Sequence, residues 1–276
     1  MDSAQADAYL RRLGAERPAR PTLDVLRELQ LRHLMAVSFE NLSIHLGEAI
    51  VLEEDRLLEK VVGARRGGFC YELNGVFGAL LTALGFDVTL LAARVYGDEE
   101  RLGIPYDHLV LRVRTVDGGD WLVDVGFGAH SQYPLAMGER GEQEDPGGVF
   151  RIIGAGAGAG AEGEGDPGDL DVVRDGRRQY RVELRPRVLG DFVAGAWWHS
   201  TSPESHFTQS LVCSRVTEDG GRITLSGRSL TVTSPGGEKK EVRELEADSE
   251  VLAVYRERFG VELSVVPSVR GAGGGG

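Results

Sequence analysis

The stretch Arg65-Arg66-Gly67-Gly68-Phe69-Cys70-Tyr71-Glu72-Leu73-Asn74 places a glycine pair and a cysteine directly before a helical pattern. Two adjacent glycines permit a tight backbone turn that larger residues would obstruct. The apolar residues that follow recur with the spacing of one helical face: Leu73, Val76, Phe77, Leu80, Leu81 and Leu84. Gly85 then stands where a C-terminal cap is expected. The pattern predicts a helix with Cys70 at or just before its N-terminus.

A cysteine at this position is well placed to act as a nucleophile. The free N–H groups and the dipole of a helix favour negative charge at its N-terminus, and Arg65 and Arg66 add positive charge nearby. Both effects favour the thiolate, which is the reactive form of cysteine. The alternative is a small buried hydrophobic residue, the usual role of a free cysteine. Cys213 fits that alternative because nothing near it in the sequence indicates activation.

Composition and charge restrict the class of function. The chain has 276 residues, of which 41% are hydrophobic and 27% charged, as in an ordinary globular protein. Its net charge of −12 argues against nucleic-acid binding, which needs a basic surface. The two cysteines do not form a disulfide framework, and no apolar run indicates a signal peptide or a membrane span. We therefore expect a cytoplasmic protein without a membrane partner.

Helical patterns come first in the chain, and strand patterns follow. Helices are predicted over 1–14, over 22–34 with Thr22 as cap, and over 245–259. Apolar and β-branched runs predict strands over 88–95, 108–113, 121–125, 179–184, 206–213, 222–225 and 229–232. A hairpin turn is predicted at 117–120. Because the strands do not alternate with helices, the fold class is α+β.

Two segments have the composition of flexible chain. Residues 154–168 are rich in glycine and alanine and predict a flexible surface insertion. No Gly-Lys-Ser/Thr follows them, so they do not form a phosphate-binding loop. Residues 271–276 are predicted to be a disordered tail.

A cysteine nucleophile needs a base, and the base needs a group that orients it. Of the six histidines, His108 opens a predicted strand, and Asp124 lies inside a very apolar one. A buried carboxylate needs a partner, either an imidazole or a structural arginine. A turn centred near Gly118 would put Asp124 opposite Arg112, about four positions or 13 Å from His108. A bulge or another strand pairing must bring the two together if they pair.

Several motifs together resemble those of the arylamine N-acetyltransferases. The stretch 65–74 is similar to their active-site signature, and Phe39-Glu40-Asn41-Leu42 resembles their Pro-Phe-Glu-Asn segment, with Ser38 in place of the usual proline. Residues 121–128 look like their aspartate strand, and 206–211 resemble a motif in their second half. The matches follow the family's order through most of the chain.

The resemblance implies a fold of three parts around a papain-like Cys-His-Asp core. A helical bundle over 1–86 would carry the nucleophile, and a β-barrel-like domain over 87–195 would carry the histidine and the aspartate. An α/β lid would span 196–270. The implied triad is Cys70, His108 and Asp124. In the implied ping-pong reaction, an acetyl group passes from acetyl-CoA to Cys70 and then to the nitrogen of an arylamine or hydrazine.

The resemblance also implies roles around the triad. The Tyr71 N–H would donate to the oxyanion, while Glu40 and Arg65 would form a buried pair that braces the site. The residues implied to line the substrate pocket are Phe39, Val95, Phe127 and Phe207. The alternative for these four is plain core, which for Val95 is as well supported as the pocket. Gly126 and Gly128 would let CoA approach the backbone. No metal and no permanently bound cofactor are implied, and we expect a monomer or a weak homo-oligomer.

Three other functions are compatible with the same motifs. The first is an amide synthase of the same superfamily, which would close a macrolactam from a polyketide chain bound to an acyl carrier protein. The second is a cysteine hydrolase that uses the triad on amides or esters, where access of water to the thioester decides the outcome. The third is a non-catalytic binding module, which the intact set of Cys70, His108 and Asp124 disfavours.

Overall fold

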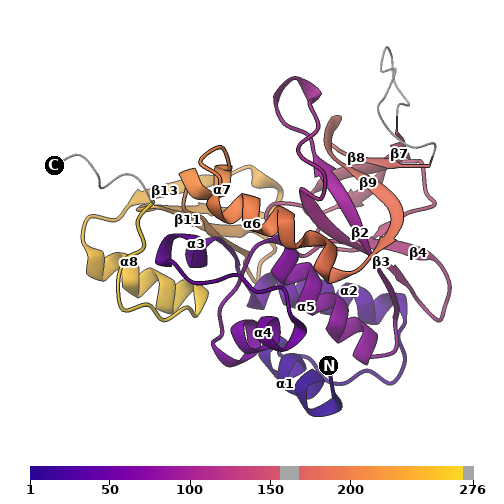
Figure 1. The fold of residues 1–276 in the computed structure, drawn as a ribbon, viewed down its shortest axis with the longest axis horizontal. Helices are drawn as coiled ribbons and strands as arrows, with labels where there is room; N and C mark the ends of the chain where they lie inside the picture. The colour runs from indigo at the N-terminus through magenta and orange to yellow at the C-terminus, as the bar shows by residue number, and fades with distance from the viewer. Residues whose placement is uncertain (156–167, 270–276) are drawn as a thin grey trace.

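The computed structural model describes residues 1–155 and 168–269. Residues 156–167 of the predicted insertion and the predicted tail at 271–276 lie outside the described residues. Figure 1 shows helices at the bottom, a large sheet at the upper right and a smaller sheet with its own helix at the left. The predicted α+β fold, with a helical first part, a barrel-like sheet and a mixed last part, is confirmed.

The first part of the chain is helical, as its periodicity predicts. It contains α1 (Ser3–Leu13), α2 (Leu23–Ala36), α3 (Leu42–Leu46), α4 (Glu54–Leu58), a π-helical turn (Glu59–Gly63) and α5 (Cys70–Ala83). The apolar helix α5 is buried along almost its whole length. Within residues 1–155 and 168–269, no helix combines the length and the apolar character needed to cross a membrane.

The N-terminus of α2 is capped from a distant part of the chain. Thr22 occupies the predicted cap position but makes no side-chain hydrogen bond to the helix. Instead, the Asp117 carboxylate accepts a hydrogen bond from the N–H of Leu23 at 3.2 Å. Because Asp117 belongs to a hairpin turn of the large sheet, this bond also ties the helices to the sheet.

The large sheet is antiparallel and has the strand order β5-β4-β3-β2-β9-β8-β7-β6. Its strands are β2 (Asp87–Val95), β3 (His108–Arg114), β4 (Asp120–Val123), β5 (Leu135–Ala136), β6 (Gln143–Asp145), β7 (Gly148–Gly154), β8 (Leu170–Arg174) and β9 (Arg177–Arg187). Side chains alternate between two cores. Ala92 and Leu109 face the core around α5, whereas Leu91 and Val110 face the interior of the curved sheet.

The smaller sheet has the order β1-β10-β11-β12-β13. It consists of β1 (Phe39–Glu40), β10 (Cys213–Val216), β11 (Arg222–Ser226), β12 (Ser229–Thr233) and β13 (Lys240–Glu244). The last helix, α8 (Asp248–Val254), continues as a π-helical turn over Tyr255–Phe259 and packs on this sheet. Short 3-10 turns lie at Asp98–Glu100, Leu189–Phe192 and Pro235–Gly237.

The link between the two sheets differs from the prediction of a strand over 206–213. Two helices, α6 (Val193–Thr201) and α7 (His206–Gln209), make the connection and are orange in Figure 1. The Ser205 hydroxyl caps α7 by accepting the N–H of Phe207 at 3.2 Å. This local cap outweighs the weak strand preference of the segment, and β10 begins only at Cys213.

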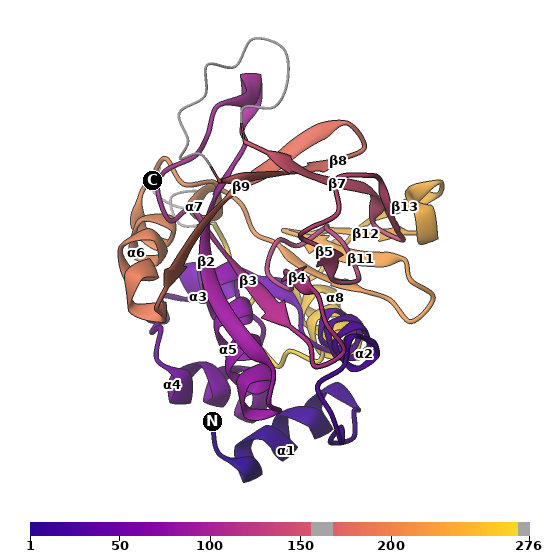
Figure 2. The same cartoon turned by 90° about the vertical axis from the view of Figure 1, so that its right-hand side faces the viewer.

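Strand β1 joins the helical first part to the smaller sheet, although it has only two residues. Phe39 and Glu40 pair with Ser214 and Cys213 of β10, and Phe39 also bridges to Gly68 just before α5. The segment therefore lies between the start of α5 and β10, and Figure 2 shows β11, β12 and β13 of the smaller sheet at the right.

We predict that Gly67→Ala destabilises the protein, because the backbone at this junction is in close contact. A β-carbon at residue 67 would lie 1.9 Å from the carbonyl oxygen of Ser38. We expect a loss of about 1–3 kcal/mol in the free energy of unfolding, as for other overpacked sites. Urea titration measures this loss. Gly138→Ala is the control, since nothing lies within 4 Å of its new β-carbon. Equal stabilities of the two variants would contradict the prediction.

Candidate active site

The structure places Cys70 at the first position of α5, at the bottom of a cavity. The thiol-bearing residue is buried, with 3% of its surface exposed. The cavity has a volume of about 630 Å³ and lies between the start of α5, the large sheet and β10–β11. Both His108 and Cys70 line it.

The strand register brings Asp124 closer to His108 than the sequence suggested. Arg112 pairs with Leu122, so the hairpin is centred on residue 117 and not on Gly118. Moving the centre by one residue moves every pairing by two. In addition, β4 ends at Val123, so Asp124 lies just beyond the strand and not inside it. Its Oδ2 is then 2.7 Å from Nε2 of His108, and no bulge is needed.

Hydrogen bonds hold the Asp124 carboxylate in place. Its Oδ1 accepts the side-chain amide of Asn74 and the N–H of Gly126, both at 2.9 Å. Asn74 lies one helical turn after Cys70 on α5 and also accepts the N–H of Val125 at 2.9 Å. The helix that carries the thiol therefore also orients the carboxylate.

The electrostatics of this cluster favour an ion pair. Burial by itself would lower the pKa of His108, but the Asp124 carboxylate and the adjacent Cys70 outweigh burial and raise that pKa to about 10. Burial would likewise raise the pKa of Asp124, but His108 lowers it to about 2. Cys70 lines the same cavity and is one of the groups that raise the pKa of His108. An imidazolium paired with the Asp124 carboxylate is therefore the stable arrangement near neutral pH.

The bracing ion pair involves Arg66, and the expectation for Arg65 was wrong. The guanidinium Nε of Arg66 donates to Oε1 of Glu40 at 3.0 Å, and both side chains are buried. Burial would raise the pKa of Glu40, but Lys60 and Arg66 hold it below its usual value. Arg65 has a φ of 53° and is exposed, because this left-handed residue turns its side chain outward. A sequence with two adjacent arginines does not indicate which one points inward.

The residues implied to line the pocket lie together in the structure. Phe39, Val95, Phe127 and Phe207, along with the two glycines at 126 and 128, all line the cavity that contains Cys70. A side chain at residue 126 would also collide with α5, since a β-carbon there would lie 2.6 Å from Cα of Cys70. The strand end can approach α5 closely only because residue 126 is glycine.

Tyr71 contributes both its backbone and its side chain. Its N–H lies in the first turn of α5, where the helix itself offers no acceptor. Its hydroxyl donates to the carbonyl oxygens of Tyr106 and Asp107, at 2.7 and 2.9 Å. These bonds attach the start of α5 to the residues directly before His108, and the sequence offered no sign of them.

The sequence also did not predict a second imidazole–carboxylate pair in the cavity. Nε2 of His199 lies 2.9 Å from Oδ1 of Asp107, and both residues line the cavity wall. Oδ2 of Asp107 accepts the N–H of Val95 at 3.0 Å. Two buried histidines elsewhere are core residues, as burial lowers the pKa of His33 to about 3 and that of His130 to about 4.

Cys213 is the structural cysteine that its sequence context suggested. It is fully buried in the core between the smaller sheet and α8. Burial and the nearby Glu40 carboxylate raise its pKa well above the usual value, which disfavours the thiolate. Over the described ranges 1–155 and 168–269, no group of three histidine, cysteine, aspartate or glutamate side chains could hold a metal ion.

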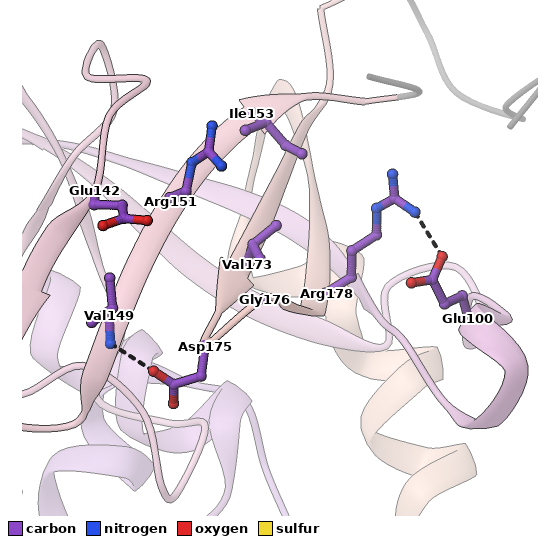
Figure 3. A pocket seen from close by; sticks show the side chains of 9 residues that line it. All are labelled: Glu100, Glu142, Val149, Arg151, Ile153, Val173, Asp175, Gly176 and Arg178. Atoms are coloured by element: carbon purple, nitrogen blue, oxygen red, sulfur yellow. Dashed lines mark hydrogen bonds and ion pairs between the residues drawn. The ribbon is translucent and has the colours of Figure 1, made fainter. Parts of the chain in front are cut away.

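Figure 3 shows another hollow, of about 550 Å³, on the outer side of β7–β9. Three of its charged side chains have partners, since Arg178 lies 2.7 Å from Glu100 and the Asp175 carboxylate accepts the N–H of Val149 at 2.9 Å. None of the described residues around it is a cysteine or a histidine. The cavity above Cys70 is therefore the better candidate for a site of chemistry.

The chain is similar to known acetyltransferases along nearly its whole length. A family described as N-acetyltransferase matches residues 22–268. An arylamine N-acetyltransferase / N-hydroxyarylamine O-acetyltransferase of Salmonella typhimurium is 33% identical over 260 residues, which cover 94% of this chain and 89% of that protein. The solved structure of an arylamine N-acetyltransferase from Salmonella typhimurium matches with a TM-score of 0.83 at 31% identity, over 95% of this chain and 92% of that one. The solved structure of the Mycobacterium marinum arylamine N-acetyltransferase in complex with CoA matches with a TM-score of 0.81 at 32% identity. The match covers 93% of this chain and 92% of that one.

We predict that Asp124→Asn leaves a buried imidazole without its counter-charge. The free energy of unfolding should fall by about 3–5 kcal/mol, as when one partner of a buried ion pair is removed. Because folding raises the pKa of His108, this group stabilises the folded protein fully below its ordinary pKa of 6.5. Because folding lowers the pKa of Asp124, that group stabilises the folded protein fully above its ordinary pKa of 3.8. The difference in the free energy of unfolding between the variant and the wild type should therefore be largest between pH 3.8 and 6.5. It should shrink as the pH rises through about 10. Denaturant titrations across this pH range measure it.

The control is Asp120→Asn, which removes an exposed carboxylate 2.7 Å from Arg114 on the same hairpin. That variant should keep its stability, since exposed ion pairs contribute little. A loss for Asp124→Asn that is the same at every pH would contradict the proposed charge state of the pair.

We predict that the two adjacent arginines differ in their importance. Arg66→Gln removes the partner of the buried Glu40 carboxylate, so the free energy of unfolding should fall by about 3–5 kcal/mol. Arg65→Gln changes the net charge equally but affects an exposed side chain, and its stability should match the wild type. Thermal unfolding of the two variants tests this directly. If Arg65→Gln were the less stable variant, the result would support the pairing of Glu40 with Arg65 that the sequence suggested.

Proposed function

The chain belongs to the arylamine N-acetyltransferase family and is an acetyltransferase, and we propose that its acetyl group travels through a thioester on Cys70. The acceptor in this proposal is the nitrogen of an arylamine or arylhydrazine, and the donor is acetyl-CoA. The observation that carries the proposal is the contact of Cys70 with His108, itself 2.7 Å from Asp124, in a cavity walled by aromatic rings.

The first step forms the acetyl-enzyme. The Cys70 thiolate attacks the thioester carbon of acetyl-CoA, and the Tyr71 N–H donates to the oxygen that becomes negative. The bond between carbon and the CoA sulfur then breaks, and the His108 imidazolium gives its proton to the leaving thiolate. Asp124 holds the imidazole through Nε2, so that its other ring nitrogen faces the thiol.

The second step releases the product. The amine nitrogen attacks the acetyl-enzyme, the new carbon–nitrogen bond forms, and the carbon–sulfur bond to Cys70 breaks. The nitrogen loses a proton to His108, which restores the thiolate–imidazolium pair. Neutral aromatic amines suit this cavity, because the rings of Phe39, Phe127 and Phe207 offer an apolar wall. The same wall disfavours water, which would otherwise hydrolyse the thioester.

The test is intact-protein mass spectrometry after mixing with acetyl-CoA in the absence of amine. We expect a single acetyl adduct that maps to Cys70 and disappears when an aromatic amine is added, because the thioester is the intermediate. Cys70→Ala should form no adduct and transfer no acetyl group, yet remain folded.

The matched control is Cys213→Ala, which should keep nearly all of its activity because that thiol is buried away from the cavity. If Cys213→Ala lost its activity while Cys70→Ala remained active, the assignment of the nucleophile would be refuted. A thiol that reacts with iodoacetamide but takes no acetyl group from acetyl-CoA would instead favour a carrier-bound acyl donor and the amide synthase reaction. Rapid loss of the adduct without any amine would favour hydrolysis.

A further inference from the structure

The backbone directly before His108 is tied to three other elements of the fold. The first tie is to β2, whose pairing with β3 ends at Ala93 and His108. Two residues further along β2, the N–H of Val95 donates to Oδ2 of Asp107 at 3.0 Å. A carboxylate therefore continues the contact between the two strands at the residue that precedes the histidine, where the backbone pairing has stopped.

This backbone also has an unusual conformation. Tyr106 has a φ of 59°, in the left-handed region that bulky residues rarely adopt. Such a conformation persists only where the surrounding contacts enforce it, and it is most common at functional sites. Here the contacts come from α5, since the Tyr71 hydroxyl donates to the carbonyl oxygens of Tyr106 and Asp107. The turn that leads into His108 is therefore strained and depends on its partners.

The third tie comes from α6, through His199. Its Nε2 lies 2.9 Å from Oδ1 of Asp107, and its Nδ1 lies 3.3 Å from Oγ of Ser205. Both ring nitrogens thus have partners within the protein. Although His199 and Asp107 line the cavity, the ring has no unengaged nitrogen with which to exchange a proton with a substrate. The arrangement suits a contact that holds α6 against the turn.

The chain leaves room for these contacts by placing glycines beside them. A β-carbon at Gly195 of α6 would lie 2.7 Å from the Tyr106 carbonyl oxygen and 2.8 Å from the Tyr71 hydroxyl oxygen. A β-carbon at Gly103 would collide with Oδ2 of Asp107. The two glycines therefore allow α6 and the loop between β2 and β3 to approach the turn closely.

We infer that Asp107 and His199 are positioning residues, which set the His108 imidazole for the chemistry by anchoring the start of β3 to β2 and α6. The inference rests on the proposed acetyl transfer and adds residues that act on the reaction through His108. Asp124 fixes the ring through Nε2, whereas this anchor fixes the backbone that carries the ring. Because a misplacement of about 1 Å can cost about a hundredfold in rate, the anchor affects the reaction without acting on the substrate.

The experiment measures two steps separately in variants of the pair: acetylation of Cys70 by acetyl-CoA without amine, and transfer from acetyl-Cys70 to an aromatic amine. We expect Asp107→Ala to slow both steps by about tenfold to hundredfold, because His108 acts in both. His199→Leu should slow both steps less, because Asp107 keeps its bond to Val95. The loss should lie in kcat, with both KM values unchanged. If Asp107→Ala does not fold, His199→Leu carries the same test.

Two comparisons separate position from stability. Asp107→Asn keeps an acceptor for the N–H of Val95 and a polar group toward His199, so both rates should return to near the wild-type values. Asp117→Ala is the matched control, since it also removes a carboxylate that accepts a backbone N–H from another element, that of Leu23. Asp117 does not line the cavity, so both rates of this variant should match the wild type.

A third measurement needs no acetyl group. Alkylation of Cys70 by iodoacetamide, mapped by mass spectrometry, should slow in Asp107→Ala and recover in Asp107→Asn, because the reactivity of the thiol depends on the position of His108. Equal alkylation rates in the wild type and Asp107→Ala would overturn the inference.

Two other results would also overturn it. One is a set of variants that lose stability but keep both rates. The other is a loss confined to the transfer to the amine, which would assign the pair to amine binding. A wild-type protein that forms no acetyl adduct would instead refute the proposed function, whereas the alkylation rates would still decide whether the anchor positions His108.

Discussion

The close contact between Gly67-Gly68 and Ser38–Glu40 is the constraint on which the rest of the structure depends. It brings the start of α5 against β1, and β1 is at the same time the edge strand of the smaller sheet. The buried pair of Glu40 and Arg66 closes this junction. Because one side of the junction carries Cys70 and the other leads to β10 and β11, the cavity arises between them.

The buried charged groups of this protein orient one another. Asp124 and Glu72, like Glu40, are acids with almost no exposed surface, and each has a cation or an imidazole within 3.0 Å. Such pairs contribute little net stability, because desolvation offsets their attraction, but losing one partner is costly. The pairs therefore fix geometry. In the case of Asp124 the geometry that is fixed is the orientation of the His108 ring.

The two walls of the cavity separate the roles that a transfer reaction needs. The aromatic wall is apolar, while the hydroxyl groups and Arg222 on β11 offer hydrogen-bonding groups. The candidate site thus combines a cysteine at the start of a helix with one apolar wall and one polar wall.

The sequence by itself determined the helical first part, the cysteine at the start of α5 and the choice of His108 and Asp124 as its candidate partners, because periodicity, glycine spacing and motifs are local properties. It could not determine the contact between those two side chains, since a hairpin centre that differs by one residue shifts the pairing by two. It also misassigned the bracing arginine, because a single left-handed residue at position 65 decides which neighbour points inward. The pair of His199 with Asp107 and the hydrogen bond from Arg222 to Ser214 were decided only by tertiary structure, because each depends on which groups meet in the folded chain.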